Sequence, residues 1–89
     1  MTEHNYANYR LLAGAIVEEQ CREYHEQYLR YLKKPTEHRQ KIVRNARRML
    51  TEHSYGLYLN LDMEAIVKEI EKKAQAGEKI RWKGNYGCR

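Results

Sequence analysis

The feature that most constrains this chain is residues 5–33, which contain no proline and a single glycine, Gly14. One glycine costs a helix only about 1 kcal/mol, so the run is expected to form one continuous helix. Such a helix spans roughly 42 Å at ~1.5 Å per residue. A compact chain of 89 residues has a radius of gyration of only ~12 Å. We therefore expect the helix to extend beyond its own domain and to favour self-association.

Tyrosines dominate one face of this expected helix. The chain has eight Tyr and no Phe, so its core is either partly hydrated or completed by another surface. Two interpretations stay open: a buried, coiled-coil-like seam with hydroxyls at its rim, or a surface on which Tyr24, Tyr28 and Tyr31 stack against a base. At 100° per residue the face comprises Tyr6, Tyr9, Ala13, Ile16, Val17, Gln20, Tyr24, Tyr28 and Tyr31.

Two shorter helices are expected after Pro35. Thr36 is a suitable N-cap for a helix at about 37–53, and Asp62 for a helix at about 63–76. Gly77 stands where a helix C-terminus favours glycine. The expected apolar stripes are Ile42, Ala46, Met49, Leu50 and His53 on the second helix, and Met63, Ile66, Val67 and Ile70 on the third.

The segments between and after these helices are less regular. Residues 54–62 suit a short helical turn or an extended connector, and residues 78–89 a short strand or a flexible arm. The predicted fold class is all-α: a three-helix protein with a long N-terminal helix and a short C-terminal arm, assembled as an oligomer. Its divisions are a helical domain at 1–77 and the arm at 78–89.

Positive charge concentrates in the second helix. The chain has 17 Lys and Arg against 12 acids, and the stretch "RQKIVRNARR" (39–48) holds five cations. Glu37 is the only acid between residues 27 and 51. A solvated helix face is one interpretation, and contact with phosphates is the other, because crowded unpaired cations repel one another. Cations in the middle of a helix suit phosphate contact better than base reading. Lys41, Arg44, Arg47 and Arg48 share this arc.

A second group of cations and aromatic rings lies in the arm. The stretch "IRWKGNY" contains Arg81, Trp82, Lys83 and Tyr86. Arginine makes bidentate contacts with phosphate, and an aromatic ring can stack on a base. This segment is therefore a candidate to close over a nucleotide held by the arginines of the second helix.

Two blocks of the sequence, "YRLLAGAIVEEQCREY" (9–24) and "YGLYLNLDMEAIVKEI" (55–70), carry a family resemblance. They resemble small helical proteins encoded by phages, prophages and mobile elements of Gram-positive bacteria. The sequence departs from that pattern at Met49 and Leu50, where an aromatic pair is usual, and at Met63, where a glycine is common. The resemblance implies an accessory to DNA metabolism, a regulator or an inhibitor of host defence. The matching residues are Ala15, Ile16, Val17, Tyr24, Tyr55, Gly56, Leu57, Leu61 and Asp62.

Several classes of site are not expected. Asp62 and Glu64 are explained by helix capping and the helix dipole, so we predict no catalytic residue and no enzyme. Cys21 and His25 are one turn apart on a helix, but a structural zinc ion needs four ligands, so no metal or other cofactor is expected. No apolar run approaches the ~20 residues of a membrane span. With two cysteines and no signal peptide, we expect a cytoplasmic protein without a disulfide framework.

The leading sequence-based hypothesis is a non-catalytic phage-type protein that binds and sequesters an anionic, nucleotide-derived signal of host defence. The alternatives are a nucleic-acid-binding accessory or regulator, and a protein inhibitor that masks a host defence enzyme. The candidate ligand-binding residues are Lys41, Arg44, Arg47, Arg48, Tyr24, Tyr28, Arg81, Trp82 and Lys83.

Overall fold

The computed structural model describes residues 3–82, and side chains from residue 8 onward. It confirms an all-α chain with three principal helices, and no strand occurs within the described range. The connector 54–62 contains a helical turn, and residues 78–82 are irregular; residues 83–89 of the expected arm lie outside the description. The helices are α1 (Glu3–Lys33), α2 (Glu37–Glu52), α3 (Tyr55–Tyr58) and α4 (Met63–Gln75).

The predicted capping residues begin and end the helices. The Thr36 side chain accepts a hydrogen bond from Arg39 N at 3.2 Å, and Asp62 Oδ1 accepts one from Ala65 N at 3.1 Å. Beyond α4, Gly77 has a positive φ of 72°, and Glu78 N donates to Lys73 O at 2.9 Å. This left-handed turn satisfies carbonyls that the helix end would leave unpaired, which is the reason a glycine suits the position.

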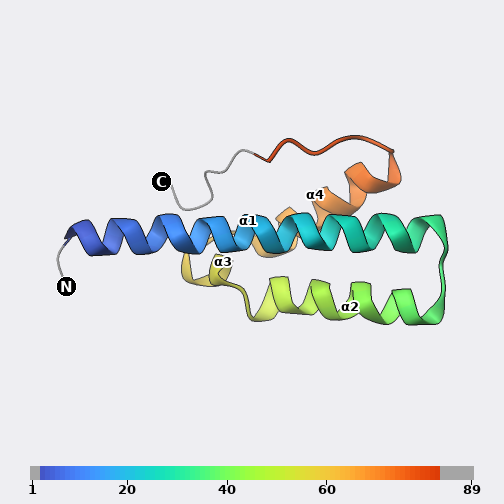
Figure 1. Ribbon diagram of the computed structural model, residues 1–89, viewed down its shortest axis with the longest axis horizontal. Helices are drawn as coiled ribbons and strands as arrows, with labels where there is room; N and C mark the ends of the chain where they lie inside the picture. The colour runs from blue at the N-terminus through green and yellow to red at the C-terminus, as the bar shows by residue number, and fades with distance from the viewer. Residues whose placement is uncertain (1–2, 83–89) are drawn as a thin grey trace.

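The helices α2 and α4 both pack against the long helix α1, on different sides of it. Figure 1 shows α2 antiparallel beside α1, α4 passing behind α1, and the described residues after α4 turning back along α1. The N-terminal end of α1 extends beyond α3. The described part of the molecule is consequently elongated, with a radius of gyration of 14.2 Å and extents of 48 × 23 × 16 Å.

The core of α1 includes only part of the expected tyrosine face. Tyr24 and Tyr28 are buried, whereas Tyr9 is 44% exposed; the Tyr6 side chain lies outside the description. Cys21 is fully buried, so the buried face is rotated toward it. The tyrosine seam is therefore mostly formed within one chain, between α1 and its own α4. The buried α1 residues are Ala13, Gly14, Val17, Cys21, Tyr24 and Tyr28.

The apolar stripe of α4 is confirmed, while that of α2 is partly wrong. Met63, Val67 and Ile70 are buried, and Ile66 packs against the core. On α2, Leu50 is buried, but Met49 is 53% exposed and His53 is also exposed. Ala46 packs against the core as predicted, and so does Val43, which the predicted stripe did not include. Adjacent residues on a helix point about 100° apart, so Met49 turns away from the core when Leu50 faces it, and His53 lies just beyond the end of α2.

None of the helices within residues 3–82 has the length and apolar character that a membrane span needs.

Candidate anion-binding face

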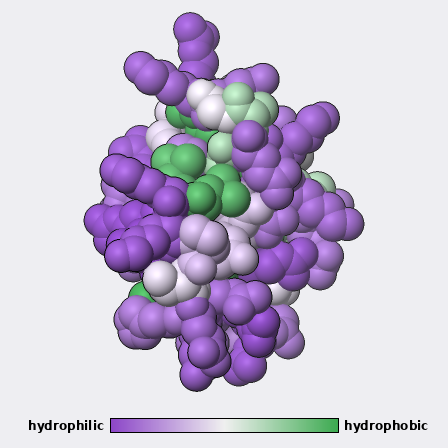
Figure 2. Space-filling model, turned by 90° about the vertical axis from the view of Figure 1, so that its right-hand side faces the viewer, coloured by the Kyte–Doolittle hydropathy of each residue, from purple (hydrophilic) through white to green (hydrophobic). Residues whose placement is uncertain are grey.

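Charge is distributed unevenly along the chain. Residues 30–48 hold eight of the 17 Lys and Arg side chains but only one of the 12 acids. The rest of the chain therefore has nine cations and eleven acids. Residues 30–48 form the end of α1, the connection and most of α2, at one end of the molecule. Figure 2 looks onto this end and shows a mostly hydrophilic surface around a small hydrophobic area.

Some of these cations have structural partners and others do not. Arg39 Nη1 donates to the carbonyl oxygen of Arg30 at 2.7 Å, which adds a second donor to a carbonyl in the last turns of α1. Arg48 Nε lies 3.5 Å from Glu52 Oε2, but both side chains are largely exposed. Lys41 and Arg44 are exposed, and within the described residues neither has a hydrogen-bond or ion-pair partner. The outward face of α2, meaning Lys41, Arg44 and Arg48, is therefore available to an anion.

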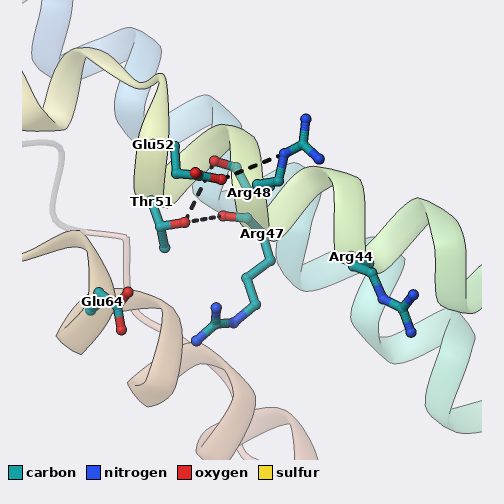
Figure 3. A pocket seen from close by; sticks show the side chains of 6 residues that line it. All are labelled: Arg44, Arg47, Arg48, Thr51, Glu52 and Glu64. Carbon is teal, nitrogen blue, oxygen red and sulfur yellow. Dashed lines mark hydrogen bonds and ion pairs between the residues drawn. The ribbon is translucent and has the colours of Figure 1, made fainter.

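Three arginines border an open depression of about 400 Å³ between α2 and α4. Figure 3 shows that Arg47 reaches toward α4, whereas Arg44 and Arg48 extend away from it and from each other. The guanidinium groups do not converge on one point, and two carboxylates share the wall. The lining residues are Arg44, Arg47, Arg48, Thr51, Glu52 and Glu64.

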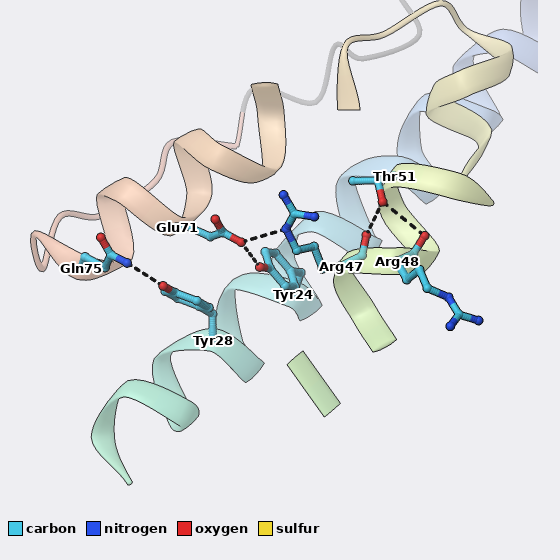
Figure 4. Close-up of polar contacts among 7 residues, drawn as sticks. All are labelled: Tyr24, Tyr28, Arg47, Arg48, Thr51, Glu71 and Gln75. Carbon is cyan, nitrogen blue, oxygen red and sulfur yellow. Dashed lines mark hydrogen bonds and ion pairs between the residues drawn. The ribbon is translucent and has the colours of Figure 1, made fainter. Parts of the chain in front are cut away.

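Arg47 belongs to a polar cluster that joins three helices. Its Nε lies 3.3 Å from Oε2 of Glu71, and the Tyr24 hydroxyl donates a hydrogen bond to the same oxygen. Next to this cluster, Gln75 Nε2 donates to the Tyr28 hydroxyl at 2.7 Å (Figure 4). Burial, and then the bond to Glu71, raise the pKa of Tyr24 above its ordinary value. This cluster holds α4 against α1 and α2.

The cluster determines what Tyr24 and Tyr28 can contact. Tyr24 has no exposed area and Tyr28 is 9% exposed, so their rings offer no face to a base in this structure. Tyr31 is half-buried and lies beside Tyr28, with ring centroids 6.3 Å apart. Stacking on a base next to the arginines would need another ring or a rearrangement of the core.

The arm residues lie elsewhere. Trp82 is half-buried and contacts α1, with its ring centroid 6.2 Å from that of His25 and 5.9 Å from Arg22 Cζ. Arg81 is exposed, and Lys83 lies outside the described residues. Trp82 does not line the arginine-bordered depression. The structure thus brings together Arg44, Arg47 and Arg48, but not the aromatic residues expected to complete a nucleotide site.

Sequence reasoning missed the acidic partners of this surface. Glu71 anchors Arg47, while Glu52 and Glu64 share the wall of the depression. No local signal in the sequence distinguishes Glu71 from the other glutamates of α4. Its role depends on the tertiary packing that brings Arg47 of α2 and Tyr24 of α1 next to it. The outward arc of Lys41, Arg44 and Arg48 was predictable, since it follows from helical periodicity.

The remaining reactive side chains are isolated or buried. Burial, followed by the nearby charge of Glu18, raises the pKa of the Cys21 thiol to about 12, so it is a poor nucleophile and metal ligand. Within the described part of the chain, no three His, Cys, Asp or Glu side chains are grouped to hold a metal ion.

Comparison with known proteins gives no further guide: no protein family, curated protein or solved structure matches this chain significantly.

Proposed function

We propose that this protein is a non-catalytic nucleic-acid-binding protein that holds phosphates on the outward face of α2. The observation that carries the proposal is the exposure of Lys41 and Arg44, which have no anionic partner among the described residues. Arg48 is also exposed, and its only described ion pair is an exposed pair within the helix. Such a pair contributes little, so Arg48 is readily redirected to a phosphate.

The direction of the side chains favours a polymer over a single small ligand. Lys41 and Arg48 are seven residues apart, which is roughly 10 Å along a helix at ~1.5 Å per residue. The guanidinium groups of Arg44 and Arg48 point apart (Figure 3), and cations spread over this length of helix suit successive phosphates of a chain. The net charge of the chain, +5 at pH 7, would also speed the approach of a polyanion. The resemblance to phage and mobile-element proteins agrees with a role in DNA metabolism or its regulation.

Sequestration of a nucleotide-derived signal is the second candidate. It is favoured by the depression of about 400 Å³, whose wall includes three arginines and Thr51. Its weakness is the position of the rings: Tyr24 and Tyr28 are buried, and Trp82 is absent from the lining. A pocketed nucleotide would also have to tolerate Glu52 and Glu64 nearby.

The experiment that tests the proposal measures binding of fluorescent duplex DNA, single-stranded DNA and a cyclic dinucleotide over a range of salt concentrations. Nucleic-acid binding should weaken steeply with salt, with a log–log slope of about −0.9 for each duplex phosphate contacted. The double variant Lys41→Glu/Arg44→Glu should abolish most of it. Lys68→Glu/Lys72→Glu changes the net charge equally on the exposed surface of α4 and is the control.

Equal losses in both double variants would show that net charge alone attracts DNA and would contradict a specific face. Binding of the cyclic dinucleotide with a shallow salt slope, in the absence of DNA binding, would favour the second candidate.

A further inference from the structure

The outward face of α1 carries leucines that stay exposed in the part of the chain that the structure describes. Leu11 is 50% exposed, Leu12 62%, Leu29 41% and Leu32 40%. They lie in two pairs, one near each end of the helix. In Figure 1, α4 passes behind α1 and no other helix crosses in front of it. Two separated apolar pairs on one helix suggest a partner that runs along its length.

The residues between these leucines continue a regular seam. Starting at position 12, steps of three and four residues lead to position 29 through side chains that are all exposed. Alternating steps of three and four keep residues on one side of a helix and are the repeat of a two-stranded coiled coil. The seam residues are Leu12, Ala15, Glu19, Arg22, Glu26 and Leu29.

The seam positions are symmetric about the midpoint between residues 20 and 21: the steps from there toward the N-terminus equal the steps toward the C-terminus. An antiparallel second copy would therefore place Leu12 opposite Leu29 of the partner subunit, and Glu19 opposite Arg22 of the partner subunit. Each pairing occurs twice by symmetry. Ala15 would lie opposite Glu26 of the partner subunit, which leaves no carboxylates facing each other in the seam. We propose that the outward face of α1 is a homodimer interface in which two copies of α1 pack antiparallel.

Charge distinguishes this arrangement from the parallel one. In a parallel, in-register pair each seam residue would face its own copy, so Glu19, Arg22 and Glu26 would all meet like charges. Directly opposed like charges disfavour a pairing. In the antiparallel arrangement, the like-charge contacts of Glu19 and of Arg22 are replaced by two symmetry-related Glu19–Arg22 pairs. The order of charges along α1 therefore selects both the orientation and the register.

The flanks of the seam agree with the same register. Leu11 and Leu32 lie one position outside the seam on the same side of α1, and antiparallel pairing brings Leu11 near Leu32 of the partner subunit. All four exposed leucines would then be covered. Arg22 already lies 3.7 Å from Glu18 and over the Trp82 ring, yet its side chain is still 49% exposed. It can therefore accept a further carboxylate at its outer edge.

Sedimentation velocity of the full chain tests the interface. The wild-type protein should form a reversible dimer. Glu19→Arg or Arg22→Glu alone should raise the dimer dissociation constant by about tenfold or more, because two attractive pairs become repulsive. The double variant Glu19→Arg/Arg22→Glu should restore affinity to within about threefold of wild type, since the pairs are re-formed with their charges exchanged.

Leu12→Asp should abolish the dimer, whereas Leu57→Asp should not. Leu57 lies on α3, is not one of the seam residues, and has a comparable exposure of 45%. Circular dichroism confirms that each variant stays helical. A wild-type monomer at all concentrations would overturn the proposal, and so would a dimer insensitive to both single charge reversals or a double variant weaker than either. Because the α2 cations are not altered, DNA binding can fail without affecting this result.

Discussion

Glu71 Oε2 lies 3.3 Å from Arg47 Nε and also accepts a hydrogen bond from the Tyr24 hydroxyl, so one carboxylate joins α4 to both α2 and α1. Arg47 and Glu71 are only partly exposed, with side-chain exposures of 38% and 24%. A charge-assisted hydrogen bond in such a setting is stronger than an exposed ion pair. Arg47 therefore has a role in stabilising the fold, which distinguishes it from its neighbours Arg44 and Arg48.

Glu71→Ala should destabilise the protein by about 1–3 kcal/mol, because it leaves the Tyr24 hydroxyl and the Arg47 guanidinium without their acceptor. Urea unfolding followed by circular dichroism measures the effect. Glu69→Ala, on the exposed side of the same helix, should change stability by no more than about 0.5 kcal/mol. Equal effects of the two variants would show that the three-helix contact contributes nothing specific.

Arg47→Met and Arg44→Met should affect different properties of the protein. Arg47→Met should lower the free energy of unfolding by about 1 kcal/mol, because it removes the partner of Glu71. Arg44→Met should leave stability unchanged but weaken DNA binding and reduce the log–log salt slope by about 0.9, the contribution of one phosphate contact. Unfolding and binding measurements on both proteins check this. Arg44 and Arg47 with identical profiles would contradict the division of roles.

Gly56→Ala should destabilise the protein by about 1–3 kcal/mol through overpacking. A Cβ atom at Gly56 would lie 2.9 Å from Met63 Cγ and nearer still to Met63 Sδ, and Met63 is only 2% exposed. Thermal unfolding measures the loss. In a double-mutant cycle with Met63→Ala, the penalty of Gly56→Ala should shrink, because the space is vacated. An unchanged penalty in the Met63→Ala background would exclude the clash as its cause.

Stability should fall as the pH rises from about 9 to about 12. The Cys21 thiol has an ordinary pKa of 9.0, which burial raises to about 12 in the folded protein. Below pH 9 the thiol is neutral in both states, so its ionisation has no effect on stability. Between the two values only the unfolded chain releases the proton, which lowers the free energy of unfolding by at most about 1.4 kcal/mol per pH unit. The raised pKa of Tyr24 acts in the same direction.

Urea midpoints measured at several pH values in a Cys88→Ser background isolate the Cys21 contribution, since Cys21 is then the only cysteine. The Cys21→Ala variant in that background should lose stability less steeply with pH. Parallel curves for the two proteins would show that the Cys21 thiol does not control the alkaline transition.

Local features of the sequence predicted the helices well. Pro35, Thr36, Asp62 and Gly77 mark helix boundaries through steric and hydrogen-bonding effects that act within a few residues. The stripe of α4 was also predictable, because a short amphipathic helix has one apolar face. The cations of the α2 arc needed only helical periodicity to be placed together.

The sequence by itself therefore determined three helices, their ends and a basic outward face on α2, all of which depend on short-range chemistry. Only the tertiary structure decided that Tyr24 and Tyr28 are buried, that Met49 is exposed and that Glu71 joins three helices. On α1, polar and apolar residues alternate around most of the circumference, so periodicity leaves its buried side ambiguous. Packing against α2 and α4 selects that side, because only there can the tyrosine rings be buried and their hydroxyls still find partners.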